Sequence, residues 1–293
     1  MTIKGNIPVI PTPFLDGKLH LGDFDKLIDA TADHLDGYVV SGSTGEAPAL
    51  SKEERIGTVD YFMKRVPSGK SVVVGLGHTN LNEAVEIGNR AADAGVKAAL
   101  IPSPYYFPNA LEMVIEYIGT IAERTGLDIV FYDNPVTTNT KFTAHDLMTL
   151  AASVPSVKSI KMTDHSFSKI RTLKEKTDLI VFGGDDIICF RAFEAGVDGN
   201  MIIAPSVFPK PFRQCWDAYQ NGDREQSFEI YSQVLLPFIS MFGPGDEIRT
   251  TKALFHHLGI FSSRETRLPL LTADDVRFKE VILGYQTGLK NSQ

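Results

Sequence analysis

Cysteine and long apolar stretches are both scarce in this chain. Its 293 residues include two cysteines, Cys189 and Cys215, with neither the CxxC spacing of a metal site nor the framework of a disulfide-rich domain. The most apolar stretch, residues 230–242, is interrupted by Ser232 and Pro237 and is too short to span a bilayer. We therefore expect no membrane association and a reduced, cytoplasmic location.

Basic residues are also fewer than acidic ones. The chain has 29 Lys and Arg against 36 Asp and Glu, a net charge of −7, and its basic residues are scattered. Nucleic acids are bound through clustered basic side chains, so no nucleic-acid partner is expected.

Neither a metal centre nor a nucleotide-binding loop is expected. The seven histidines are dispersed, and His256 and His257 are adjacent on a predicted helix, where they point apart. Asp185 and Asp186 could hold Mg²⁺, but such a pair more often starts a helix or forms a polar rim. The nearest string to GxGxxG, residues 75–80, lacks the third glycine and follows the third predicted strand rather than the first.

Short apolar runs alternate with amphipathic segments through the first 205 residues. The runs are continuous and rich in β-branched residues, which is typical of parallel strands covered on both faces. They span residues 7–10, 38–40, 72–74, 98–101, 129–132, 157–160, 179–182 and 201–203. Between them apolar residues recur at helical spacing, and capping-box patterns predict helix starts at Ser51, Asn80 and Thr143.

This alternation predicts an α/β fold, a (β/α)8 TIM barrel, over residues 1–205. An open, doubly wound sheet has the same local pattern, but eight is the number of strands that closes into a barrel. Residues 206–293 are predicted to be helical throughout. Because no Pro/Gly/Ser-rich linker precedes them, we expect these helices to pack on the barrel as a C-terminal extension.

Lys161 is the most informative residue for function. It follows the sixth run directly, and the ends of barrel strands carry catalytic groups. Burial disfavours a charged lysine, and the neutral amine is a nucleophile toward carbonyl carbon. Taken alone, such a lysine more often snorkels to solvent or pairs with a carboxylate such as Asp164. Tyr132, however, ends the neighbouring run, so a phenol that could shuttle protons during imine formation shares the same rim.

A glycine-bounded loop follows the second run. Gly42-Ser43-Thr44-Gly45 offers backbone N–H groups and two hydroxyls, which could hold a small carboxylate or phosphate. By itself a GxxG string is better explained as a tight turn. Its place on the same predicted rim as Lys161 and Tyr132 makes it a candidate binding loop.

These residues resemble those of a known family. Residues 42–46 (GSTGE), Pro104-Tyr105-Tyr106, Tyr132-x-x-Pro135, Lys161 and Gly184-Asp185-Asp186 are similar, in order and spacing, to the motifs of the dihydrodipicolinate synthase / N-acetylneuraminate lyase family. The resemblance covers nearly the whole chain. It implies a metal-free class I lyase on a (β/α)8 barrel with a helical C-terminal extension.

The resemblance also implies roles for single residues. Lys161 would form a Schiff base with the keto carbon of pyruvate or a related 2-oxo acid, and Tyr132 would relay protons. Ser43 and Thr44 would hold the carboxylate, with Thr44 passing protons between Tyr132 and Tyr106. The family's equivalent of Tyr106 is often lent across a subunit interface, so a homodimer or homotetramer is expected. Further substrate-binding positions are Thr137, Thr163, Gly184, Met201 and Ile203.

Departures from the family pattern bear on the substrate. Synthases that use aspartate semialdehyde carry an arginine, which grips a carboxylate, where this chain has Thr137; a threonine cannot form that bidentate clamp. Sialic acid lyases bind sugar hydroxyls with an acidic residue and a serine where this chain has Ile187 and Ile203. We therefore predict aldol cleavage or condensation of a small 2-oxo acid with a smaller or less hydroxylated aldehyde.

Three alternatives stay open. The first is a 4-hydroxy-tetrahydrodipicolinate synthase with an atypical acceptor clamp. The second is a dehydratase of 2-keto-3-deoxy sugar acids that uses the same lysine and tyrosine. The third is a non-catalytic homologue that only binds a 2-oxo acid, although a silent homologue has no chemical reason to keep Lys161, Tyr132, Tyr106 and Thr44 together.

Overall fold

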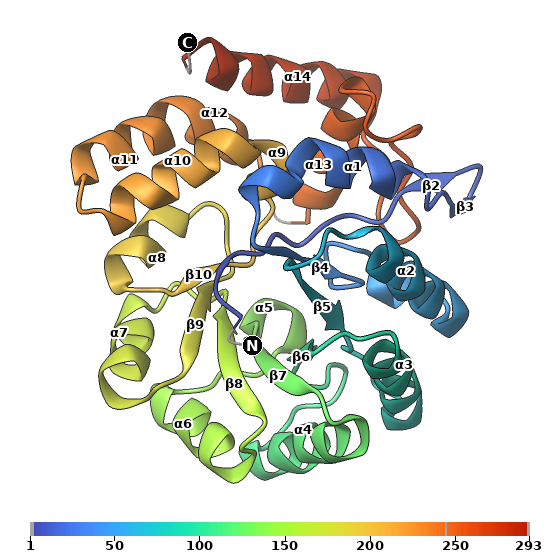
Figure 1. Ribbon diagram of the computed structural model, residues 1–293, viewed down its shortest axis with the longest axis vertical. Coiled ribbons are helices and arrows are strands. Elements are labelled where there is room, and N and C mark those ends of the chain that lie inside the picture. The colour runs from blue at the N-terminus through green and yellow to red at the C-terminus, as the bar shows by residue number, and fades with distance from the viewer. Residues whose placement is uncertain (1–2, 244, 292–293) are drawn as a thin grey trace.

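A ring of eight parallel strands forms the centre of the molecule (Figure 1). The computed structural model describes residues 3–243 and 245–291. The strands are β1 Gly5–Asn6, β4 Gly37–Val40, β5 Ser71–Gly75, β6 Ala98–Pro102, β7 Asp128–Asp133, β8 Val157–Met162, β9 Ile180–Gly183 and β10 Gly199–Asn200. They pair in the order β1-β10-β9-β8-β7-β6-β5-β4, and a parallel bridge between Val9 and Val39 joins the two ends of the sheet.

The predicted barrel is confirmed, with displaced boundaries at its first and last strands. The runs 7–10 and 201–203 begin just after β1 and β10, which consist of Gly and Asn and carry no apolar signal. The ladder continues through both runs, because the N–H of Val9 donates to the carbonyl of Ile202 at 3.2 Å. Inside the barrel sheet, the Nδ2 of Asn200 donates to the Oδ1 of Asn6 at 2.9 Å, and the other polar atom of each buried amide has no hydrogen-bond partner among the described residues.

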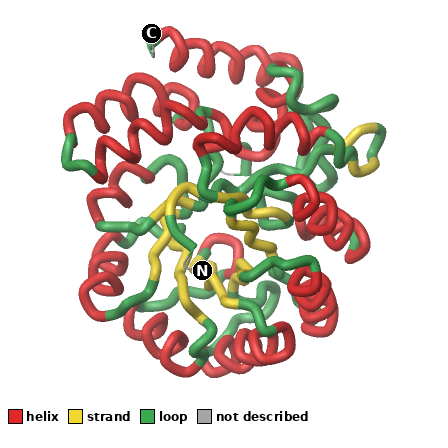
Figure 2. Tube along the Cα trace, viewed as in Figure 1, coloured by secondary structure: helices red, strands yellow, loops and turns green. Residues whose placement is uncertain are grey.

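Helices link the strands and surround the barrel (Figure 2). They are α1 Asp23–Thr31, α2 Lys52–Arg65, α3 Leu81–Asp93, α4 Leu111–Thr125, α5 Pro135–Thr138, α6 Ala144–Ser153, α7 Phe167–Lys176 and α8 Cys189–Ala195, with 3₁₀ turns η1 Ala32–His34 and η2 Ala47–Ala49. The predicted helix starts are confirmed. Ser51 and Thr143 form capping boxes, and the Asn80 side chain accepts backbone N–H groups from the first turn of α3.

The chain after the barrel adds a layer of helices on one side, with α14 outermost (Figure 1). They are α9 Ala204–Val207, α10 Pro209–Gln220, α11 Arg224–Ile230, the π-helical turn η3 Tyr231–Leu235, α12 Leu236–Ile239, α13 Glu247–His257 and α14 Asp275–Lys290. The boundary predicted at residue 205 falls inside α9, and the division into two units stays a prediction.

The prediction that this part is helical throughout is wrong for residues 258–274, which form a loop. Gly259, at φ 70°, takes the left-handed conformation that ends α13, and Pro269 has no N–H for a helical hydrogen bond. The loop is held by distant partners instead. Its Ser262 donates from both N–H and hydroxyl to Asp23 of α1, at 2.6 and 2.9 Å.

A small hairpin, β2 Phe14–Leu15 and β3 Lys18–Leu19, follows the first strand and was not predicted. Its turn residues Asp16 and Gly17 both have positive φ, and both donate their N–H groups to the Glu265 carboxylate. The hairpin thus ties the loop 258–274 to the start of the barrel. No helix in the described ranges is long and apolar enough to cross a membrane.

Candidate active site

Lys161 extends from β8 directly beside Tyr132 of β7. The two residues are in register across the strand pair, and the Lys161 Nζ lies 4.2 Å from the centroid of the Tyr132 ring. Lys161 is only 2% exposed, so it does not snorkel to solvent. The pairing with Asp164 that could have made it structural is taken by another lysine, Lys169.

The environment of this pair shifts both groups toward their neutral forms. Burial lowers the pKa of Lys161 from 10.5 to about 7, and the charges of Asp186 and Asp185 oppose the shift only in part. Burial also raises the pKa of the Tyr132 phenol, with a further contribution from Glu247. Near neutral pH the site therefore holds an amine that is about half unprotonated and a phenol that keeps its proton.

Close packing fixes the stem of Lys161. A Cβ at Gly184 would lie 3.0 Å from the Cε of Lys161 and 2.7 Å from the carbonyl oxygen of Met162, so only glycine fits there without displacement. Nearby, Thr163 donates its N–H and its hydroxyl to the carbonyl of Asp133, at 3.1 and 2.7 Å. The Thr163 hydroxyl therefore bonds the end of β7 in this structure.

The unusual Asp133 beside Tyr132 has a structural partner. Its carboxylate is buried and accepts a hydrogen bond from the Nζ of Lys169 at 2.7 Å, and Lys169 also pairs with Asp164. This ion pair joins the end of β7 to α7. Asp133 thus braces the strand that carries Tyr132.

The loop after β4 is held from behind by the C-terminal extension. Its last residue, Glu46, has a left-handed φ of 56° and is 2% exposed. The Glu46 carboxylate forms an ion pair with Lys252 of α13, which is fully buried, and accepts the backbone N–H of Arg267 at 2.8 Å. Burial lowers the pKa of Lys252 to about 8. A residue more than 200 positions away thereby anchors the loop that carries Ser43.

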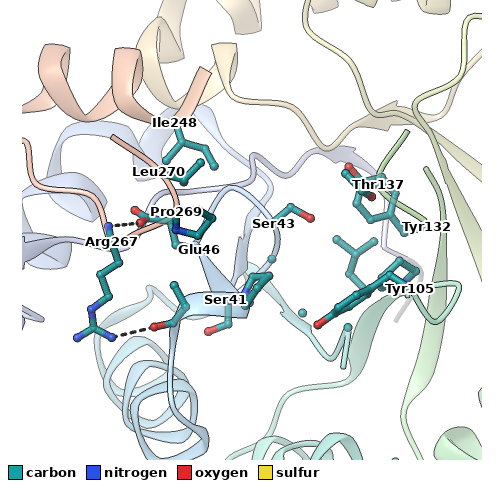
Figure 3. A pocket seen from close by; sticks show the side chains of 18 residues that line it. Ser41, Ser43, Glu46, Tyr105, Tyr132, Thr137, Ile248, Arg267, Pro269 and Leu270 are labelled. Carbon is teal, nitrogen blue, oxygen red and sulfur yellow. Dashed lines mark hydrogen bonds between the residues drawn. The ribbon is translucent and has the colours of Figure 1, made fainter. Parts of the chain in front are cut away.

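A cavity of about 360 Å³ opens in front of Tyr132 (Figure 3). Ser43 and Thr137, both exposed and both predicted to bind substrate, border it together with Tyr105. Its opposite wall comes from the C-terminal extension: Ile248 of α13, with Pro269 and Leu270 of the loop 258–274. The structure thus brings three predicted site residues, Ser43, Tyr132 and Thr137, to one cavity. Lys161 does not line this cavity itself, and its Nζ lies 4.2 Å from the ring centroid of Tyr132, which does.

Other predicted residues do not border this cavity. Thr44 is buried within its loop, and no hydrogen bond in the described part of the chain joins it to Tyr132 or Tyr106. Tyr106 is 88% exposed, has φ 90°, and packs its ring edge-on against Phe107. Met201 and Ile203 are buried in the segment after β10.

Asp186 was named in the sequence analysis as part of the Gly184-Asp185-Asp186 motif but was not among the predicted catalytic or binding residues. Its carboxylate is buried after β9 and accepts the N–H groups of Ile203 and Ala204, at 3.0 and 2.6 Å. Burial raises its pKa to about 7, and the charge of Lys161 opposes that shift. In the described ranges no three His, Cys, Asp or Glu side chains are placed to hold a metal ion.

The wall formed by Ile248, Pro269 and Leu270 was not predicted. These residues lie in the part of the chain predicted to be wholly helical, and no motif marks them. They reach the cavity because α13 and the loop 258–274 fold back over the barrel, as the hydrogen bonds of Arg267 and Ser262 show. Only the tertiary structure could identify them.

Comparisons of the sequence and of the structure with known proteins all point to the same protein family. The model of the Dihydrodipicolinate synthetase family matches residues 2–282. A 4-hydroxy-tetrahydrodipicolinate synthase of Thermosipho africanus (strain TCF52B) is 30% identical over 275 residues, 92% of this chain and 93% of the relative. One of Bacillus subtilis (strain 168) is 30% identical over 273 residues, 90% and 92% of the two chains. The crystal structure of dihydrodipicolinate synthase from Thermotoga maritima has a TM-score of 0.91 at 26% identity, covering 98% of each chain.

Proposed function

Because the chain belongs to the dihydrodipicolinate synthetase family and is an enzyme of the carbon–carbon lyase class, we propose that it works through a Schiff base between Lys161 and pyruvate or a related 2-oxo acid. The observation that carries this proposal is the buried amine of Lys161, 4.2 Å from the centre of the Tyr132 ring and with a pKa lowered to about 7. An amine that is already neutral can attack a ketone without first losing a proton to water.

Each step has a candidate group in the site. The Lys161 amine adds to the keto carbon, and the resulting carbinolamine loses water to form the imine. Tyr132, whose raised pKa keeps its proton in place, can protonate the departing hydroxyl. Loss of a proton from the carbon next to the imine gives an enamine, and that carbon then attacks an aldehyde. The Ser43 hydroxyl is available for the carboxylate of the 2-oxo acid. The covalent imine takes the place of a cofactor, and these steps need neither a metal nor a nucleotide.

Borohydride trapping tests the proposal. The protein is treated with borohydride with and without pyruvate, and the adduct is located by peptide mass mapping. We expect a pyruvate-dependent adduct at Lys161 and none after Lys161→Met. Lys158, exposed on the same strand, is the internal control. A pyruvate-dependent adduct at Lys158, or none at all, would refute the assignment.

A second candidate, 4-hydroxy-tetrahydrodipicolinate synthesis, is favoured by the names of the relatives. Against it stands Thr137, in the place where the family resemblance expects a carboxylate-binding arginine. Arg267 borders the cavity but donates to both carboxylate oxygens of Glu54 at 2.6 Å, so it offers no free clamp. Efficient condensation of pyruvate with aspartate semialdehyde would establish this candidate, and we expect that reaction to be poor.

We further propose that the active form is a homodimer or homotetramer in which Tyr106 completes the site of a neighbouring subunit. Its 88% exposure and positive φ support this, since a bulky residue held in that conformation needs a stabilising contact. Tyr106→Phe and Lys161→Met variants, each weakly active or inactive alone, should recover roughly a quarter of wild-type activity when their subunits are mixed. A fully active monomer in sedimentation experiments would contradict the proposal.

We also propose a cytoplasmic location, on the basis of the two cysteines. Cys189 and Cys215 are both buried free thiols, which suits a reducing compartment. Cell fractionation with an antibody against the protein would test this.

A further inference from the structure

The wall of the cavity that faces Tyr132 is made of hydrocarbon (Figure 3). Three separate segments supply it: the η2 turn, α13 and the loop 258–274. The side chains that form it are Ala47, Pro48, Ile248, Pro269 and Leu270. A group bound beside Tyr132 on this side would therefore contact carbon atoms.

The charged side chains that border the cavity already form ion pairs with other residues of the protein. Of the described residues that line it, two carry a charge, Glu46 and Arg267. Arg267 pairs with both oxygens of Glu54 and lies over the Phe14 ring, and its guanidinium points away from Tyr132 (Figure 3). Glu46 is bound to Lys252 and to the backbone of Arg267. Turning Glu46 toward a ligand would leave the fully buried Lys252 unpaired, which is costly, and turning Arg267 would break its two hydrogen bonds to the half-buried Glu54.

Apart from Lys161, the other charges close to Tyr132 are acidic. Glu247, next to Ile248 in α13, and Asp185, after β9, both raise the pKa of the Tyr132 phenol through their charge. Burial in turn raises the pKa of Glu247, and no cation in the described part of the chain forms an ion pair with it. A second carboxylate on the substrate would meet repulsion here. Thr137, on the side of the cavity near Tyr132, is uncharged.

We propose that the aldehyde that reacts with the enamine is uncharged and has an apolar body, aliphatic or aromatic, which packs between the η2 turn and the wall formed by Ile248 and Leu270. This inference rests on the proposed lyase function and narrows its second substrate. The cavity of about 360 Å³ lies within the usual range of small-molecule sites. A carboxylate in the same place would lose its hydration without gaining a cation.

A matched pair of aldehydes tests this directly. 4-Methylpentanal and succinic semialdehyde share the same chain and differ in ending with an isopropyl group or a carboxylate. With pyruvate as donor, we expect kcat/KM to be at least about 100-fold higher for 4-methylpentanal, since the carboxylate is desolvated without a partner. Benzaldehyde should also react, and erythrose, of similar size but hydroxylated, should react poorly. Equal or better reaction of succinic semialdehyde or erythrose overturns the inference, as does failure of both apolar aldehydes.

Variants of the apolar wall supply the second test. Leu270→Asn keeps the size of the side chain but makes it polar, and should raise KM for 4-methylpentanal about tenfold. The matched control is Leu271→Asn, because Leu271 is the next residue, is 66% exposed and does not border the cavity. It should leave KM unchanged. Equal effects of the two variants would overturn the inference.

The pyruvate-trapping reaction at Lys161 distinguishes failure of the proposed lyase function from failure of the proposed apolar acceptor. It needs no aldehyde, so it reports on the lyase function without depending on the choice of acceptor. If trapping fails in the wild-type protein, the lyase function itself is wrong. If trapping succeeds while the charged aldehyde is preferred, only the choice of an apolar acceptor is wrong.

Discussion

Replacing Lys161 with methionine should abolish the lyase reaction and also make the protein more stable. Lys161 is 2% exposed, and burial lowers its pKa from 10.5 to about 7. The unfolded chain restores the ordinary pKa, so at pH 7 this one group costs the folded state roughly 4 kcal/mol. Methionine has a similar length and no charge, and it can occupy the same space beside Tyr132.

The pH dependence distinguishes this explanation from a simple packing effect. Below pH 7 both folded and unfolded chains carry the proton, and the full cost of burying the charge is present. As pH rises from about 7 toward 10.5, the unfolded chain holds a proton that the folded chain has released, so the wild type gains stability. The advantage of Lys161→Met should therefore shrink by about 1.4 kcal/mol for each pH unit in this range.

Urea unfolding of the two proteins near pH 6 and near pH 9 measures this gap. The control is Lys158→Met, at an exposed position of the same strand, which should change the free energy of unfolding by no more than about 0.5 kcal/mol. A gap between Lys161→Met and wild type that stays the same at both pH values would refute the reasoning. So would a destabilised Lys161→Met, since it would mean that the amine is well solvated in the folded protein.

Three further results are expected. Gly184→Ala places a methyl group 3.0 Å from the Cε of Lys161, so pyruvate-dependent trapping should slow by about tenfold while the circular dichroism spectrum is unchanged; an unaltered rate would contradict the close packing. Lys169→Met leaves the buried Asp133 carboxylate unpaired and should lower the free energy of unfolding by about 3 kcal/mol, part of which Asp133→Asn should restore in the double variant. The rate of imine formation with pyruvate should rise with pH up to about 7 and then level off, because the pKa of Lys161 is about 7; a flat profile from acid to neutral pH would count against a lowered pKa.

Much of the architecture could be read from local patterns. Each continuous apolar run is long enough to form a strand buried on both faces, and each amphipathic segment between two runs is long enough to return the chain to the start of the next strand. The number of such units then implies closure. The hydrophobicity pattern did not predict the polar strand positions Asn6 and Asn200. It wrongly predicted a helix for residues 258–274, whose apolar residues lie in a loop.

The sequence by itself determined the barrel, the order of its strands and the position of Lys161 and Tyr132 at neighbouring strand ends, because parallel strands all end on the same rim. What only the tertiary structure decided is the environment of those groups. The pKa of Lys161 depends on how completely other side chains exclude water from it, and the apolar wall depends on Ile248 and Leu270 folding back over the barrel. Burial is a property of contacts between distant segments, and no local pattern encodes it.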